Sequence, residues 1–338
     1  MKKYNVQIIL AIALAILAYM AQEEIIGKYA LSVLMFMGIN VILSTSLNLV
    51  NGYMGEFSCG HAGFMAVGAY VSSVLGVMLF AKDKVFGPAL LDPSLSIWIF
   101  PLIVIVGGVA AALAGLLVAI PSFKTRGDYL AIITIAANYI VISLVENIDT
   151  IGGARGFMGM KSVVKAMGKT VDMPWMPIWV FIFTILSVWI IRRFISSTFG
   201  KGVPAINQDE IAAEIMSVNT NKMKMVAFML SSGLAGVAGA LFAYILGYVN
   251  PGSFTILKST EVLVMVYLGG MGSLSGSVLS AILFTLLLEA LRPLQIIKWV
   301  VVPFLLILLM QFRPEGIMGN RELPDFFPRL KRFYAFKD

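Results

Sequence analysis

Long apolar blocks alternate with short polar segments along this chain. The block PLIVIVGGVAAALAGLLVAI, residues 101–120, is typical. About 20 apolar residues in a helix cross the roughly 30 Å hydrocarbon core of a bilayer. One block precedes residue 25, and further blocks cover about 29–50, 62–80, 97–120, 129–147, 175–192, 225–249, 255–272, 276–291 and 296–312. The pattern predicts an all-α, polytopic membrane bundle of about ten transmembrane helices.

The first block has the charge pattern of a secretory signal peptide, because Lys2 and Lys3 precede its apolar stretch. A cut after Ala21 would place Tyr19 where a signal peptidase requires a small residue. We therefore expect this block to be retained as the first span. Later in the chain, Lys258 and Glu261 stand three residues apart at the start of the eighth span, where they can pair or lie at the membrane interface.

Composition supports a membrane location, because 59% of the 338 residues are hydrophobic and only 13% are charged. An ordinary soluble domain has about 45–50% hydrophobic residues and about 25% charged residues. The single cysteine excludes an internal disulfide and any site that needs several cysteines.

The distribution of lysine and arginine predicts the orientation. Placing both termini in the cytoplasm puts the majority of the 25 basic residues inside. This topology gives one transmembrane domain over residues 1–318, an outer loop at 148–174, an inner loop at 193–224 and a basic cytoplasmic tail at 319–338. The net charge of +7 is then mostly charge at the membrane surface. No basic run with interleaved aromatics stands clear of the bilayer, so we expect no nucleic acid partner.

Small residues recur at four-residue spacing, which lets helices approach closely in lipid. Three triplets show this spacing: Gly107, Ala111 and Gly115; Ser232, Gly236 and Ala240; Gly272, Gly276 and Ser280. They predict a tightly packed bundle.

Two stretches imitate a phosphate-binding loop. GARGFMGMKS, residues 153–162, has Met160 between its last glycine and Lys161, and GKT at 168–170 has Val163 where the first glycine is required. Neither follows a predicted strand. We expect this chain to bind no nucleotide, so any ATP is bound by a partner.

The inner loop contains the segment DEIAAEIMSVN, residues 209–219, which predicts a short helix. Acidic residues suit a helix start, and the residues that follow favour helix. The Asn219–Asn221 segment can end it. Physical chemistry alone leaves three possibilities open: a solvated loop, an interfacial anchor or a docking element for a cytoplasmic partner.

Several ordered blocks now resemble one family. DEIAAEIMSVN followed by KMKMVAFMLSSGLAGVAGALFA is similar to the cytoplasmic loop and next span of LivM-type permeases of branched-chain amino acid ABC importers. LNLVNGYMGEFSCGHAGFMAVGAY, TRGDYLAIITIAANYIVISLVENIDTIGGARGF and STEVLVMVYLGGMGSLSGSVLSAIL resemble further family blocks in the same order, so the resemblance covers roughly residues 29–318.

The resemblance implies a transport subunit of a prokaryotic cytoplasmic membrane and not an enzyme. It implies a LivH-type second permease, two cytosolic ATPase subunits that bind ATP and Mg, and a periplasmic or lipid-anchored solute-binding protein. It also implies an ATPase-coupling segment, made of Asp209, Glu210, Ile211, Ala212, Ala213, Glu214, Met216 and Ser217.

Two positions depart from the family pattern. Ser217 stands where the family usually has glycine, and Asn207 stands where it usually has a basic residue. Serine tolerates a helix interior better than glycine. We therefore expect no sharp helix break at Ser217.

The only cysteine and the only histidine lie in MGEFSCGHAG, residues 54–63, close to Glu56. A structural zinc site usually needs four ligands, and only Glu56, Cys59 and His61 are present. The glycines instead predict a backbone break along a solute pathway. MGSLS at 271–275 echoes MGEFS at 54–58, which suggests shared backbone geometry. The predicted pathway residues are Asn48, Gly52, Gly55, Glu56, Gly60, His61, Gly272 and Gly276, and no metal site is predicted.

Other classes of protein remain open at this stage. An ion-coupled secondary transporter of a small polar solute would use Glu56, Glu146, Glu261 or Glu289, since carboxylates within spans are usually functional. Urea and amide importers have related permeases. An intramembrane hydrolase would need a base oriented by a third group, and only the neighbourhood of His61 could supply it.

Overall fold

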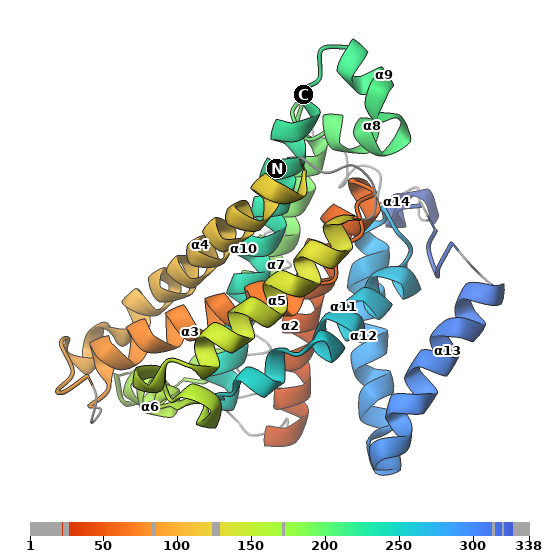
Figure 1. Ribbon diagram of the computed structural model, residues 1–338. Helices are drawn as coiled ribbons and strands as arrows, with labels where there is room; N and C mark the ends of the chain where they lie inside the picture. The colour runs from red at the N-terminus through yellow and green to blue at the C-terminus, as the bar shows by residue number, and fades with distance from the viewer. Residues whose placement is uncertain are drawn as a thin grey trace, which may run out of the picture.

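The computed structural model describes residues 22, 27–82, 86–123, 129–170, 173–312, 315–319 and 321–326. Within this part of the chain, six helices are long and apolar enough to cross a membrane. They are α2 (Lys28–Asn48), α3 (His61–Phe80), α4 (Ser96–Ser122), α5 (Tyr129–Glu146), α7 (Trp175–Ser196) and α10 (Thr220–Leu246). The structure thus confirms a helical bundle with membrane-spanning character (Figure 1).

Three shorter apolar helices follow: α11 (Ile256–Gly269), α12 (Leu274–Ala290) and α13 (Lys298–Phe312). The 14 residues of α11 extend only about 21 Å, which is less than a bilayer core. The count of ten spans is therefore not confirmed. The predicted first span lies outside the described residues, apart from Gln22.

The short surface helices lie at opposite ends of the bundle (Figure 1). One end carries α8 (Gly202–Gln208), α9 (Glu210–Ile215) and α14 (Leu323–Phe326), and the other carries α6 (Met160–Thr170). We call these the α9 end and the α6 end. The predicted topology requires the loops 148–174 and 193–224 to lie at opposite ends of the bundle, as they do here. Which end faces the cytoplasm is predicted from the distribution of lysine and arginine.

One two-stranded antiparallel sheet accompanies the helices and leaves the predicted helical bundle intact. Strand β1 (Phe157–Met158) pairs with β2 (Tyr248–Val249), with Phe157 opposite Val249. Strands of two residues are too short to show an alternating pattern, so the hydropathy pattern does not predict them. The pair fixes the loop 148–174 to the end of α10.

Helix α10 lies at the centre of the bundle and packs against α2, α3 and α4. Two of the predicted small-residue triplets meet here, since α4 presents one and α10 the other. A Cβ atom on Gly115 would overlap Ser232, and one on Gly236 would overlap Ala111. The predicted tight packing is therefore confirmed, because these helices approach more closely than any larger side chain allows.

Candidate functional site

The first backbone break follows α2. A π-helical turn over Leu49–Tyr53 leads into an irregular segment that lasts until His61 begins α3. The side chain of Asn51 closes this segment by accepting a hydrogen bond from the Ser58 N–H at 3.2 Å. Gly60 lies so close to α5 that a Cβ atom would overlap the Thr134 carbonyl. The predicted break at these glycines is therefore present.

The second break separates α11 from α12 at residues 270–273. Gly270 and Gly272 both adopt left-handed backbone conformations, with φ of 106° and 79°. The Ser273 hydroxyl accepts a hydrogen bond from the Gly276 N–H at 3.0 Å and so caps α12. Gly269 and Gly276 bring the two helices into backbone contact, since a Cβ atom on either would crowd the carbonyl of the other.

The two breaks touch each other through Asn48, which is fully buried. Its side-chain oxygen accepts a hydrogen bond from the Gly272 N–H at 3.0 Å, and its amide donates to the Ser273 carbonyl at 2.9 Å. Gly52 packs directly on the same backbone. Gly55 has φ of 76°, close to the 79° of Gly272 at the matching position of the sequence echo. The echo therefore shares a left-handed glycine at its second position, while the backbone that follows differs, because α12 begins at Leu274 and α3 only at His61. We call the contact of Asn48 and Gly52 with residues 272 and 273 the break junction.

The side chains of Glu56, Cys59 and His61 do not converge. Glu56 Oε1 lies 2.7 Å from the Lys224 ammonium, and His61 Nε2 lies 2.8 Å from the Ser46 hydroxyl. Burial raises the pKa of the Cys59 thiol, which disfavours the reactive thiolate. Nowhere in the described ranges do three His, Cys, Asp or Glu side chains come close enough to hold a metal ion. The arrangement serves packing and ion pairing.

Lys224 links the first break to the α9 end. Its ammonium lies 2.7 Å from Glu56 Oε1 and 2.8 Å from Glu210 Oε1, and its side chain is only 9% exposed. Asn207, in α8, adds a second link by donating to the Gly52 carbonyl at 3.1 Å. In the sequence, Lys224 is one of the basic residues that the predicted topology places inside. A lysine just inside an apolar helix and a glutamate in a backbone break are the signal that could have paired them.

Helix α9 begins as predicted, because the Asp209 side chain accepts a hydrogen bond from the Ala212 N–H at 3.0 Å. Glu214 accepts a hydrogen bond from the Thr220 hydroxyl at 2.9 Å. Asn219 does not end α9 but caps the start of α10, accepting from the Lys222 N–H at 3.0 Å. Both helix starts are thus fixed locally.

The expectation of no sharp break at Ser217 was wrong. Ser217 has φ of 64°, the left-handed conformation that usually ends a helix at a glycine. The N–H groups of Ser217 and Val218 donate to the Glu214 and Ala213 carbonyls, so the turn closes despite the side chain. Because Asn219 must start α10 at once, the chain has to reverse here whatever residue occupies the position.

We expect Ser217→Gly to stabilise the protein by up to about 1 kcal/mol, because glycine adopts this conformation without the steric cost that serine bears. Thermal unfolding of the purified protein measures the effect. Ser197→Gly, at an extended position with φ of −71°, serves as the control and should destabilise, because glycine gains backbone entropy when unfolded and the hydroxyl's hydrogen bonds with Phe194 and Gly200 are lost. An equal response of the two variants would contradict strain at Ser217.

The side chains of α9 divide into two groups. Ala213 is only 6% exposed and packs inward, whereas Ile211, Ile215 and Met216 are 69%, 78% and 78% exposed. Large apolar side chains gathered on a helix outside the membrane-spanning segments are unusual in a monomer. This surface, which we call the α9 apolar face, has the composition of a contact site for another protein.

Glu322, near the C-terminus, packs on the break junction, a contact that no local sequence pattern predicts. Glu322 accepts hydrogen bonds from the N–H groups of Leu274 and Ser275 at 2.7 and 3.1 Å and from the Tyr53 hydroxyl at 3.1 Å. Its carboxylate thus sits at the positive end of α12 and bridges to the first break. Glu322 belongs to the tail that was predicted to begin at residue 319, so the start of this tail packs on the transmembrane helices.

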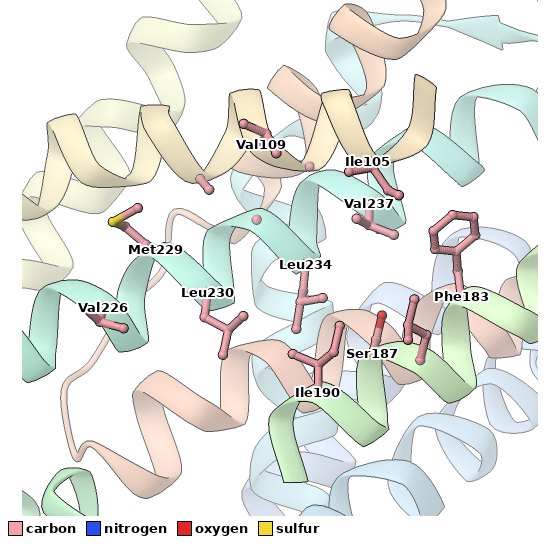
Figure 2. Close-up of a pocket in the computed structure, with 14 residues that line it drawn as sticks. Ile105, Val109, Phe183, Ser187, Ile190, Val226, Met229, Leu230, Leu234 and Val237 are labelled. Atoms are coloured by element: carbon pink, nitrogen blue, oxygen red, sulfur yellow. The ribbon is translucent and has the colours of Figure 1, made fainter. Parts of the chain in front are cut away.

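An apolar groove runs between α4, α7 and α10 (Figure 2). It has a volume of about 440 Å³ and is lined by side chains such as Ile105, Leu186 and Met229. Ser187 supplies the only oxygen drawn among its labelled side chains. A surface of this chemistry suits hydrocarbon and offers a polar solute little beyond the Ser187 hydroxyl.

The geometry defines a multi-pass helical membrane protein with paired backbone breaks, joined by ion pairs to a short helix outside the membrane-spanning segments. Among known proteins, the sequence profile described as branched-chain amino acid transport system / permease component matches residues 29–311. The chain belongs to this family.

Known proteins of this family align with most of the chain. It is 31% identical over 345 residues to the high-affinity branched-chain amino acid transport system permease protein LivM of Escherichia coli K12, covering 95% of this chain and 76% of that protein. It is 23% identical to a probable LivM of Methanocaldococcus jannaschii, over 89% of this chain and 95% of that protein. It is also 24% identical to LivH of Salmonella typhimurium, over 83% of this chain and 92% of that protein. No solved structure matches the chain.

Proposed function

We propose that this chain is a permease subunit of an ATP-driven importer for branched-chain or related amino acids. Its similarity to both LivM and LivH supports assembly with a related, LivH-type second permease. In this assembly two cytosolic ATPase subunits bind ATP and Mg, and a solute-binding protein delivers the amino acid. The chain itself transports and does not hydrolyse ATP. Its location is the prokaryotic cytoplasmic membrane.

The proposed orientation places the α9 end in the cytoplasm and the α6 end outside, with both termini inside. The basic residues at the α9 end support it by the positive-inside rule. The break junction then lies toward the cytoplasmic side. Because Asn48 and Glu322 hold its backbone together, the junction closes the inner side of the solute pathway in this conformation.

The α9 apolar face carries the proposed function, because an exposed apolar surface is stabilised when a partner covers it. Ile211, Ile215 and Met216 would enter a groove on an ATPase subunit. Glu210 on the same helix pairs with Lys224, and Lys224 pairs with Glu56 of the first break. A movement of the docked helix can therefore reach the break junction through two ion pairs.

The inward position of Ala213 decides which substitution tests docking. Arg at Ala213 would disturb the seating of α9 on its own chain, since Ala213 is buried. Exposed Ile211 and Ile215 avoid that complication.

We expect the double variant Ile211→Asp/Ile215→Asp to weaken association with the ATPase subunits by about 2 kcal/mol or more, which is roughly 30-fold. Membrane insertion should not change, because both side chains point away from the bundle. Recovery of the ATPase subunits with the purified permease pair measures the effect. Ile148→Asp makes the same change at an isoleucine that is 44% exposed at the α6 end, and should leave recovery unchanged. Full recovery with the double variant would remove α9 from the coupling role.

The ion-coupled alternative finds less support in the structure. Glu56 pairs with Lys224, Glu261 with Lys258 and Glu289 with Arg292. Of the two possibilities left open for Lys258 and Glu261, the structure shows the pairing, at 2.8 Å. A proton or sodium relay needs a carboxylate that is free to exchange its cation, and these three already have protein partners. Glu146, the fourth candidate, is exposed at the last residue of α5.

A further inference from the structure

A polar cavity of about 300 Å³ lies between α2, α10, α11 and α12, outside the break junction. Asn40 of α2 lines it and stands eight residues before Asn48, so the cavity is about 12 Å farther along α2 toward the α6 end. We propose that this cavity binds a zwitterionic amino acid with an apolar side chain on its way to the break junction. The inference rests on the proposed function and deepens it, because it assigns a solute site to this chain.

The floor of the cavity is a buried polar pair. Asn40 is only 6% exposed, and its amide donates to the Thr285 hydroxyl at 2.9 Å. Thr285 in turn donates to the Ala281 carbonyl at 2.7 Å. Asn40 lines the cavity, so its side-chain oxygen can accept a hydrogen bond from the ammonium group of a bound ligand.

The cationic groups at the rim are paired with neighbouring carboxylates. Lys258 lies 2.8 Å from Glu261, and Arg292 lies 3.4 Å from Glu289. Lys258, Glu289 and Arg292 line the cavity. The longer contact between Glu289 and Arg292 is the weaker one, so its carboxylate and guanidinium are the groups most easily shared with a ligand. The lining itself carries two cations and one carboxylate, which can hold the carboxylate and the ammonium group of one zwitterion and which disfavour a net cation.

The remaining wall is apolar. Phe36, Ile39, Phe242 and Leu288 line it, and the rings of Phe36 and Phe242 lie with centroids 6.0 Å apart. An aliphatic side chain gains free energy on entering such a surface, whereas a polar side chain loses its hydrogen bonds to water. The cavity therefore combines the two features needed to recognise an aliphatic amino acid.

A cysteine-protection experiment on the assembled importer tests the assignment. Cys59 is the single cysteine of this chain, so Cys59→Ala provides a background in which Thr285→Cys is the only thiol. In proteoliposomes, a small methanethiosulfonate reagent modifies this thiol, and mass spectrometry of the chain gives the rate. We expect L-leucine to slow modification by about tenfold at a concentration near ten times its dissociation constant. Leucine amide and 4-methylpentanoate, which each lack one of the two charges, should protect much less.

The control is Lys165→Cys in the same background, on the exposed surface of α6, where leucine should have no effect. Protection that follows the phosphatidylethanolamine content of the vesicles and not leucine would identify a lipid headgroup site and overturn the proposal. Equal modification rates with and without leucine, in a complex that still transports leucine, would overturn it while leaving the proposed function intact. A wild-type complex that binds no ATPase and transports no amino acid would contradict the proposed function itself.

Asn40→Leu gives a second measurement: it fills the same volume without the amide, and we expect it to abolish leucine protection while membrane abundance is kept.

Discussion

Gly68→Ala is expected to lower the free energy of unfolding by about 3 kcal/mol, at the upper end of the range for overpacked cores. Gly68, on α3, meets α10 at Gly236, and one added Cβ atom would overlap the Gly236 backbone. Backbone atoms within a helix cannot turn aside as a flexible side chain can. Helices α3 and α10 would have to separate, and α4 would move with them because Gly107 packs against Gly68. The apparent melting temperature in detergent and the abundance of the protein in membranes measure the loss.

Gly168→Ala is the matched control. Gly168 lies within α6, and nothing is within 4 Å of the position that its Cβ atom would occupy. Alanine should stabilise this helix by roughly 0.5–1 kcal/mol, because glycine loses more conformational entropy in a helix. Opposite signs for the two substitutions would attribute the effect to helix contact. If Gly68→Ala unfolds like the unmodified protein, the close approach of α3 and α10 is not needed for stability.

Lys224→Met is expected to uncouple ATP hydrolysis from transport and to reduce uptake by about tenfold or more, the effect of roughly 1.4 kcal/mol of lost coupling. Methionine keeps most of the length of the side chain but removes the charge that joins Glu56 to Glu210. Two carboxylates would then face each other without a cation. Breaking a fully buried pair costs about 3–5 kcal/mol, and the cost is smaller here because Glu210 is 45% exposed. Uptake and ATPase rates in proteoliposomes measure the two halves of the cycle.

Lys222→Met provides the control for Lys224, since Lys222 lies in the first turn of the same helix and is exposed. It should leave uptake and ATPase rate unchanged. A double-mutant cycle with Glu56→Gln isolates the pair, because removing both partners should cost less than the two single changes added together. Additive effects of the two changes would show that the ion pair does not transmit the signal.

Local features of the sequence predicted much of the bundle. Helices α3, α4, α5, α7 and α10 match the predicted spans to within a few residues, with the largest difference at the start of α10. Asp209 predicted the start of α9, and the small-residue triplets predicted the tight packing that is found between α4 and α10. These features depend on a single helix and its immediate environment. The pattern was weaker where the apolar blocks were short, and α11 ended before a full span.

The functional contacts depend on residues far apart in the chain. Asn48 meets Gly272, Glu56 meets Lys224, and Glu322 meets α12 across distances in sequence that no local pattern encodes. The short strand pair and the left-handed Ser217 were missed for a related reason, since neighbouring elements impose both conformations.

The sequence by itself determined that this chain is a helical membrane protein of the branched-chain amino acid permease family, because hydropathy and ordered motifs are properties of consecutive residues. Only the tertiary structure decided how the two breaks meet, which face of α9 is exposed and where Asn40, Thr285 and Glu289 enclose a polar cavity. The physical reason is that helix packing in lipid is set by close backbone contacts and by the pairing of a few buried polar groups. Those pairings form only when distant segments are brought together.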